Sequence, residues 1–220
     1  MKYLNSWFQV NESDNSEENP IRSERLLTQA QRSFQDEPEV PSVDLPALLF
    51  TDVERSAEMW SFDATEMMAQ LKDHHKLVEK LSEMNGGWIV KTIGDAFMIY
   101  FEPSSDSLER AIKCATEIIL QEPKYKLRIG ICQGPMQEDT YRIQKVNLRD
   151  FYGNAVNVAS RMESRVAGQS DTIAFSSTRG LSQESLDRIS NRFGEVMEVN
   201  LSKYDLKGAK INSAFRIKVK

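Results

Sequence analysis

The segment over residues 88–101 constrains the fold of this 220-residue chain more than any other segment. It consists of two short apolar runs separated by the pair Gly94-Asp95. Glycine tolerates a positive φ angle and aspartate bonds to nearby backbone, so this pair between hydrophobic runs predicts a β-hairpin. Lys91 lies just before the turn and Asp95 lies in it, where both side chains could be directed into a cleft. The alternative is an ordinary solvated turn with a charge on each side.

Composition limits the class of protein. Hydrophobic residues make up 40% of the chain and charged residues 28%, which is typical of a soluble globular protein. The net charge of −5 is too small to indicate a nucleic-acid partner. Cys114 and Cys132 lie in an apolar helical pattern and an apolar strand pattern, which predicts buried thiols in a reducing compartment. With no apolar run long enough for a membrane span and no signal-peptide pattern at residues 1–10, we expect a cytoplasmic enzyme.

The first 44 residues differ in composition from the rest of the chain. Residues 11–20 are acidic, polar and poor in hydrophobic side chains, which predicts disorder. A weak apolar stripe over 21–35 allows one short helix, and prolines after it indicate a linker. The chain is therefore expected to divide into a flexible acidic segment, 1–44, and a folded domain, 45–220. The segment could dock a regulatory partner or serve only as a tether.

Strand and helix patterns alternate through the folded domain. Strands are predicted over 47–53, 88–93, 96–101, 127–132 and 172–175, with 143–148 pairing with 127–132, and with 193–199 and 214–219 completing a sheet edge. Helices are predicted over 64–84, 105–120, 153–166 and 177–189. Helices packed on a mainly antiparallel sheet give an α+β fold, and the β-α-β-β-α-β order is that of a ferredoxin-like core.

Four motifs occur in a fixed order along this domain. They are Phe-Thr-Asp-Val at 50–53, Lys-Thr-Ile-Gly-Asp-Ala-Phe-Met at 91–98, Arg-Ile-Gly-Ile at 128–131 and Asp-Phe-Tyr-Gly-Asn-Ala-Val-Asn-Val-Ala-Ser-Arg-Met-Glu at 150–163. Together they resemble the class III nucleotidyl cyclase catalytic domain, the adenylate and guanylate cyclase family. The resemblance covers roughly residues 45–219. It implies a reaction in which the ribose 3′-hydroxyl of a nucleoside triphosphate attacks the α-phosphorus and pyrophosphate leaves.

The resemblance implies two metal-binding carboxylates, Asp52 and Asp95, assisted by the backbone carbonyl of Val53. Two carboxylates that meet at one point can hold two Mg²⁺ or Mn²⁺ ions, which lower the pKa of the attacking hydroxyl and bridge the phosphates. Asp52 ends the first strand and Asp95 lies in the hairpin turn, so adjacent antiparallel strands would bring them together. The alternative role for Asp52 is an N-cap of the following helix.

Asn157 and Arg161 are four residues apart and share one face of the predicted helix. In the family, residues at these positions hold the ribose and place positive charge at the α-phosphate in the transition state. A surface helix with a solvated arginine is the alternative. Lys207 matches a short Lys-Gly motif whose lysine contacts the terminal phosphates, although a plain turn lysine is an equal alternative and Lys210 is a rival.

Lys91 and Asp150 are the residues from which we predict the base. Adenine presents an acceptor at N1 and a donor at its 6-amino group, which an ammonium and a carboxylate complement, whereas guanine presents the reverse pattern. In the family, Lys and Asp at these positions mark adenylate cyclases, while Glu with Cys or Ser marks guanylate cyclases. Cytosine shows the same acceptor and donor pair as adenine, so a cyclase that makes cyclic CMP or UMP is an alternative, as are a guanylate cyclase and a silent cyclase-like regulatory module.

Arg55 departs from the family pattern. Arg55 stands where similar cyclases commonly have glycine, so its side chain either points outward or adds a cation near the phosphates.

The family forms its site between two catalytic domains, and this chain carries both sets of residues. A head-to-tail homodimer with ATP as substrate is therefore expected, with no dedicated partner cyclase.

Overall fold

The structure is a computed structural model, and it describes residues 44–143, 146–168 and 171–219. The expected acidic segment and its short helix at 21–35 lie outside the described residues. The first half of the domain contains β1 (Leu45–Val53), α2 (Ser56–Phe62), α3 (Ala64–Met84), β2 (Gly87–Ile93), β3 (Ala96–Ser104), α4 (Ser107–Gln121) and β4 (Leu127–Gln133). The second half contains β5 (Gln137–Ile143), β6 (Val146–Tyr152), α5 (Asn154–Arg161), the π-helix η2 (Met162–Ala167), β7 (Thr172–Ser177), α6 (Gln183–Phe193), β8 (Val196–Glu198), the short 3₁₀ helix η3 (Leu201–Lys203) and β9 (Phe215–Lys218).

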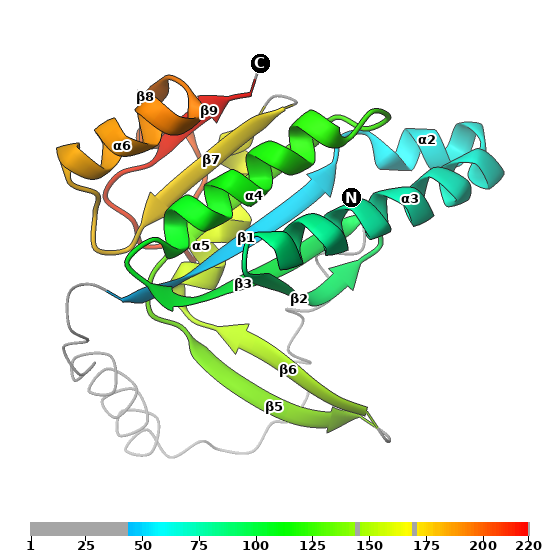
Figure 1. The fold of residues 1–220 in the computed structure, drawn as a ribbon, viewed down its shortest axis with the longest axis horizontal. Coiled ribbons are helices and arrows are strands. Elements are labelled where there is room, and N and C mark those ends of the chain that lie inside the picture. The colour runs from blue at the N-terminus through cyan, green and yellow to red at the C-terminus, as the bar shows by residue number, and fades with distance from the viewer. Residues whose placement is uncertain (1–43, 144–145, 169–170, 220) are drawn as a thin grey trace, which may run out of the picture. The chain divides into compact units, whose positions relative to one another are not determined.

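A seven-stranded sheet in the order β2-β3-β1-β4-β7-β9-β8 forms the centre of the domain (Figure 1). All of its strand pairs are antiparallel except β4 with β7. The first four strands and the helices between them have the βαββαβ connectivity and the strand order of a ferredoxin-like core. The predicted α+β fold is confirmed.

Helices cover both faces of this sheet because its strands carry apolar side chains on both sides. The core on one face unites α3, α4 and α6 with alternate residues of the central strands, among them Leu49, Phe97 and Ile131. The core on the other face joins α5 and η2 to the strand residues that alternate with those of the first core, including Leu48 and Met98. Cys114 and Cys132 are buried with free thiols, as the apolar patterns predicted.

The predicted pairing of 143–148 with 127–132 is wrong. Residues 137–143 and 146–152 instead pair with each other as a separate two-stranded hairpin, β5–β6, with Asp139 opposite Asp150. Figure 1 shows this hairpin extending beyond the main sheet. The neighbour of β4 on the side away from β1 is β7, which a parallel crossover through α5 and η2 brings there. Local sequence contains no signal for that long-range choice.

The helices differ from the predicted set in three places: the helix predicted over 153–166 is divided into α5 and η2, α6 has other bounds, and α2 was not predicted. Helix α6 begins at Gln183 instead of 177, because Ser177 belongs to β7 and the side chain of Ser182 caps the helix by accepting from Ser185 N at 3.2 Å. Several serines in this segment are chemically suitable caps, so composition could not select one. Helix α2 was not predicted, because its seven residues are too few to show a clear apolar period.

Helix α5 continues into η2 directly above β4, and a single glycine permits this approach. A Cβ on Gly130 would lie 2.1 Å from the backbone nitrogen of Glu163 and 2.3 Å from the carbonyl oxygen of Ala159. Any side chain at this position of β4 would therefore push the helix off the strand. Among the described helices, none is both long and apolar enough to cross a lipid bilayer.

Candidate active site

Asp95 is bonded to the end of β1, next to Asp52. The backbone N–H of Val53 donates to Oδ2 of Asp95 at 3.3 Å, which ties the turn between β2 and β3 to the last residues of β1. Burial raises the pKa of the Asp52 carboxyl above its ordinary value, and the nearby negative charge of Asp95 adds to this, although hydrogen bonding to Arg128 acts in the opposite direction. The hairpin turn, although largely exposed, therefore directs the Asp95 carboxylate toward the end of β1, where Asp52 lies.

Asp52 does not cap a helix. It pairs within β1, and the residue at the N-cap of α2 is Arg55, whose side chain makes no capping hydrogen bond. The next helix, α3, is capped by Asp63, which accepts from Thr65 N at 3.0 Å and Glu66 N at 2.9 Å. The capping role considered for Asp52 is therefore excluded, and its carboxylate is available for other contacts.

Arg128 on β4 lies between two carboxylates. It is the cross-strand partner of Asp52, to which its Nη2 donates a hydrogen bond. On the other side its Nε lies 3.6 Å from Oε1 of Glu163, the second residue of η2. Burial raises the pKa of Glu163 to about 7, with a further contribution from the charge of Asp52, while Arg128 acts to lower it. The first metal-ligand candidate is thus part of a three-residue charge network.

Arg55 has a left-handed backbone conformation, with φ of 61° and ψ of 26°. Glycine adopts this conformation without steric cost, which explains why a glycine suits this loop. The exposed guanidinium of Arg55 pairs with Glu58 one turn into α2. Its charge is therefore compensated by its neighbour, while the side chain lines a pocket beside the loop.

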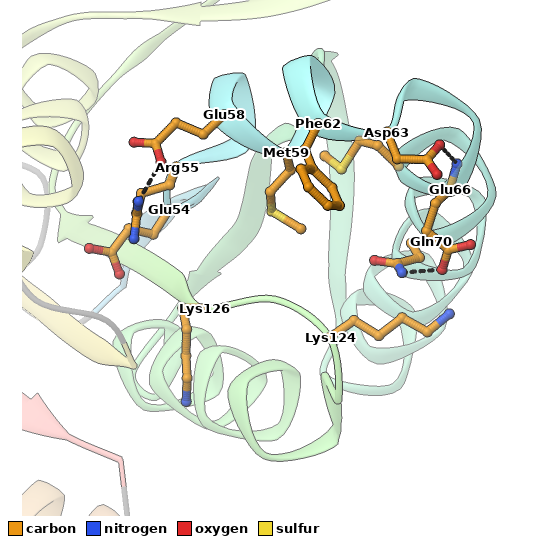
Figure 2. A pocket seen from close by; sticks show the side chains of 11 residues that line it. Glu54, Arg55, Glu58, Met59, Phe62, Asp63, Glu66, Gln70, Lys124 and Lys126 are labelled. Atoms are coloured by element: carbon orange, nitrogen blue, oxygen red, sulfur yellow. Dashed lines mark hydrogen bonds and ion pairs between the residues drawn. The ribbon is translucent and has the colours of Figure 1, made fainter.

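A pocket of about 760 Å³ opens beside this loop, between α2, the start of α3 and the segment before β4. Figure 2 shows Met59 and Phe62 projecting from α2 on one side and Lys124 and Lys126 on the opposite side. Both lysines are engaged: Lys124 with Asp73 at 3.4 Å and Lys126 with Asp171 at 2.6 Å. The described lining does not include Asp52 or Asp95, so the pocket lies next to the carboxylate pair and not over it.

Lys91 and Asp150 form an ion pair, with Nζ and Oδ2 separated by 2.5 Å. A β-bulge in β2 makes this contact possible. Ile89 pairs with Ile99 and Lys91 pairs with Met98, so one extra residue, Val90, is inserted between the two pairs. Bulges redirect side chains across a sheet, and this one places Lys91 opposite Met98, on the face that carries β6.

Aromatic stacking fixes β6 beside β3. The rings of Tyr100 and Phe151 are stacked with centroids 4.1 Å apart and an interplanar angle of 8°. The guanidinium of Arg149 lies 4.4 Å from the ring centroid of Trp88, on β2. These contacts flank Asp150 on both sides in sequence and hold its strand against β2 and β3.

Arg161 contacts the backbone of Lys207 and not its ammonium group. Nε of Arg161 donates to the backbone carbonyl of Lys207 at 3.2 Å. Asn154, at the start of α5, fastens the same loop by exchanging two hydrogen bonds with the backbone of Lys210, at 2.7 and 2.8 Å. Asn157 is exposed on α5, one turn before Arg161. The helix therefore presents an amide and a guanidinium next to the loop that follows η3.

The predicted residues thus fall into three groups. These are Asp52 and Asp95 with Val53, then Lys91 with Asp150, and finally Asn157 and Arg161 with the backbone of Lys207. Sequence reasoning assigned no role to Arg128, Glu163 or Asn154. The spacing of Arg128 and Gly130 could have indicated the first two. Residues two apart on a strand share a face, and a glycine on that face lets a helix lie close to the strand, so Arg128 is expected to face a residue of that helix.

The sequence model described as the adenylate and guanylate cyclase catalytic domain matches residues 39–218. The chain belongs to this family. The match covers most of the chain and includes every described strand of the main sheet. The resemblance inferred from four short motifs is therefore confirmed.

Curated relatives of this cyclase-family chain include adenylate cyclases from fungi and trypanosomes. An adenylate cyclase of Podospora anserina is 30% identical over 166 residues, which is 62% of this chain and 8% of the relative. A receptor-type adenylate cyclase of Trypanosoma congolense is 33% identical over 88 residues, 39% of this chain and 12% of the relative. The chain therefore spans only a small part of the length of these relatives.

Solved cyclase domains have the same fold. A guanylate cyclase domain from Catenaria anguillulae, solved with GTP, has a TM-score of 0.63 at 22% identity and covers 82% of this chain and 100% of that one. A bacterial light-regulated adenylyl cyclase has a TM-score of 0.58 at 18% identity, covering 80% of this chain and 90% of its own. At such identities the likeness shows the fold and not the substrate.

Proposed function

We propose that this cyclase-family domain is an adenylate cyclase, which converts ATP to 3′,5′-cyclic AMP and pyrophosphate. In this reaction the ribose 3′-oxygen forms a bond to the α-phosphorus, the bond from that phosphorus to the pyrophosphate oxygen breaks, and the hydroxyl proton is released. The observation that carries the proposal is the Val53 N–H to Asp95 contact of 3.3 Å, because it brings the turn carboxylate to the end of β1, where Asp52 lies.

The carboxylate pair suits two hard divalent cations. Asp52 and Asp95 offer carboxylate oxygens, and Val53, which follows Asp52 and bonds to Asp95 through its N–H, offers a backbone carbonyl. These are donors preferred by Mg²⁺ and Mn²⁺. No group of three or more His, Cys, Asp or Glu side chains suited to a metal occurs among the described residues. The remaining ligands would then be phosphate oxygens and water. Bound there, the ions would lower the pKa of the 3′-hydroxyl and neutralise phosphate charge.

Lys91 and Asp150 are proposed to select adenine. In the described structure the two side chains form an ion pair of 2.5 Å, and a base that inserts between them must replace that contact. Adenine does so, since N1 accepts from the ammonium and the 6-amino group donates to the carboxylate. The curated relatives named above are adenylate cyclases, which supports this assignment.

Asn157 and Arg161 are proposed to act on the ribose and the α-phosphate. The Arg161 side chain is already oriented by the Lys207 carbonyl, which leaves its terminal nitrogens to donate elsewhere. A fixed positive charge stabilises the oxygens on which negative charge develops as the new bond forms. The exposed amide of Asn157 lies one helical turn away, where it can hold the ribose.

We propose a head-to-tail homodimer in which each site takes Asp52 and Asp95 from one protomer and the other two groups from its partner. Apolar side chains near the base-selecting strands support an interface there. Ile93 at the end of β2 is 63% exposed and Tyr152 at the end of β6 is 48% exposed. Side chains of this kind are commonly covered at dimer interfaces.

A guanylate cyclase would have the same fold, as the domain solved with GTP does. A pyrimidine cyclase or a silent regulatory module would keep the same fold.

The proposal is tested by incubating the purified chain with Mn²⁺ and ATP and measuring cyclic AMP, for the native protein and for Asp95→Asn. We expect the substitution to lower the rate by about a thousandfold, because it removes the charge of a metal ligand while keeping the side-chain shape. Asp187→Asn on α6, remote from the carboxylate pair, is the matched control and should retain the native rate. Unchanged cyclic AMP formation by Asp95→Asn would contradict the proposed mechanism.

A further inference from the structure

Glu163 is a mostly buried carboxylate to which the proposed reaction gives no role. Its side chain is 13% exposed, and its Oε1 has no hydrogen-bond partner among the described residues. The Nε of Arg128, 3.6 Å away, is likewise buried without a hydrogen-bond partner in the part of the chain that the structure describes. Two buried, oppositely charged atoms therefore face each other at a distance slightly too long for a hydrogen bond.

The backbone enforces this placement. Gly130 allows the junction of α5 and η2 to lie directly on β4, with the Glu163 nitrogen where a side chain would otherwise be. Arg128 is two residues from Gly130 and so projects from the same face of β4. The π-helix begins at Met162, and π-helical turns are frequent at functional sites. Glu163 therefore reaches Arg128 because of a fixed helix-on-strand contact and not because of a flexible side-chain choice.

Arg128 divides its donors between two carboxylates. Its Nη2 is bonded to Asp52, while its Nε faces Glu163. A divalent cation bound by Asp52 would replace the guanidinium as the partner of that carboxylate and would repel it. The displaced guanidinium then needs another negative partner, since a charge left unpaired in a partly buried position is costly. Glu163 is in place to be that partner.

We propose that Glu163 is a positioning residue that draws Arg128 away from Asp52, and so sets the affinity of the Asp52 and Asp95 pair for divalent cations. This inference rests on the proposed function, because it requires that the two carboxylates bind metal. It assigns Glu163 no contact with nucleotide or metal. A purely structural role would affect folding but would not couple Glu163 to metal binding through Arg128.

The test is a Mn²⁺ titration of the full chain without nucleotide at pH 8, followed by electron paramagnetic resonance of the free ion. We expect Glu163→Gln to weaken binding by about tenfold, because Arg128 then competes with the cation for Asp52 and the loss of a group behind a metal ligand commonly has an effect of this size. Glu163→Asp keeps the charge and should recover part of that loss. The matched control is Glu109→Gln, because Glu109 is 12% exposed and pairs with Arg188 and Arg192 on α6, away from this network. Its affinity for Mn²⁺ should equal that of the native chain.

The double variant separates positioning from simple loss of charge. In an Arg128→Met background there is no guanidinium to draw away, so adding Glu163→Gln should change the affinity by less than about twofold. Native affinity in Glu163→Gln would overturn the inference, as would an equal loss with and without Arg128. If the native chain and Asp52→Asn bind Mn²⁺ alike, the proposed metal site itself is wrong, and the inference is overturned with it. Thermal unfolding of each variant checks that the fold is intact.

Discussion

The ammonium of Lys91 lies 2.5 Å from Oδ2 of Asp150, joining the strand before the hairpin turn to the strand before α5. The two partners are unequally exposed, at 41% for the lysine side chain and 7% for the aspartate. The aspartate is fixed further because its Oδ1 accepts from the N–H of Phe151 at 2.8 Å. The pair therefore combines a fixed carboxylate with an ammonium that can move, which suits the insertion of a base edge between them.

Base selection should follow this pair. Replacing it with Lys91→Glu and Asp150→Cys reverses the pattern of donors and acceptors, so we expect kcat/KM for ATP to fall by about a hundredfold or more and activity with GTP to appear. Initial rates with ATP and GTP measure both effects. Lys113→Glu, an exposed change on α4, is the control for the change of charge. An unaltered ratio of ATP to GTP activity in the double variant would contradict the assignment.

The shared site predicts complementation between two inactive chains. Asp52→Ala removes one group and Arg161→Ala removes another, so a mixed dimer contains one intact site. With random exchange, equal amounts of the two chains should recover about a quarter of the native activity. The assay is cyclic AMP formation after mixing, with dimer formation followed by analytical ultracentrifugation. Failure to recover activity while both chains dimerise would rule out the head-to-tail arrangement.

The raised pKa of Glu163 predicts how stability depends on pH. Its carboxyl has an ordinary pKa of 4.5 and a folded pKa of about 7, so the folded state binds the proton more tightly than the unfolded chain. The contribution of the protonated Glu163 carboxyl to the free energy of unfolding is therefore fully present below about pH 4.5 and is lost as the pH rises through 7.

Comparison with Glu163→Gln isolates this effect, because all other groups titrate in both chains. The free energy of unfolding of the native chain should fall relative to the variant by on the order of 2 kcal/mol between pH 5 and pH 8. Urea denaturation at several pH values measures the difference. Parallel profiles for the two chains would show that Glu163 does not titrate in this range.

The left-handed conformation of Arg55 predicts an unusual ranking of substitutions. Glycine normally destabilises a chain relative to alanine, but at φ of 61° alanine carries the steric cost and glycine does not. Arg55→Gly should be more stable than Arg55→Ala by about 1 kcal/mol. Thermal unfolding of both variants measures the ranking, and the same order at Glu58 would not be expected because that residue is helical. Alanine as the more stable replacement would contradict the backbone geometry of this loop.

Much of the main sheet followed from local sequence. The apolar run 47–53, the Gly-Asp turn and the helical stripe over 64–84 each encode their own element, and the structure has them within two residues of the predicted bounds. The β5–β6 hairpin did not follow, because the polar sequence of β5 shows no clear strand pattern. The pairing of β4 with β7 did not follow, because these strands are far apart in sequence. Local pattern specifies elements, and tertiary packing specifies their neighbours.

The charge network around Arg128 was harder to foresee. Its contact with Asp52 depends on the register of β1 against β4, and its contact with Glu163 depends on the helix that Gly130 admits. The bulge at Val90 has no residue signature of its own, yet it decides the face on which Lys91 lies. Motifs thus indicated which residues matter, while backbone irregularities and register determine what those residues contact.

The most direct test of the central claim is an incubation of the purified chain with Mn²⁺ and equal concentrations of ATP, GTP, CTP and UTP, with cyclic products measured by mass spectrometry. Cyclic AMP should exceed each other cyclic nucleotide by about a hundredfold, because only adenine satisfies both Lys91 and Asp150 on a purine ring. Predominance of cyclic GMP, CMP or UMP would contradict the base assignment, and the absence of any cyclic product would contradict the proposed activity of the domain.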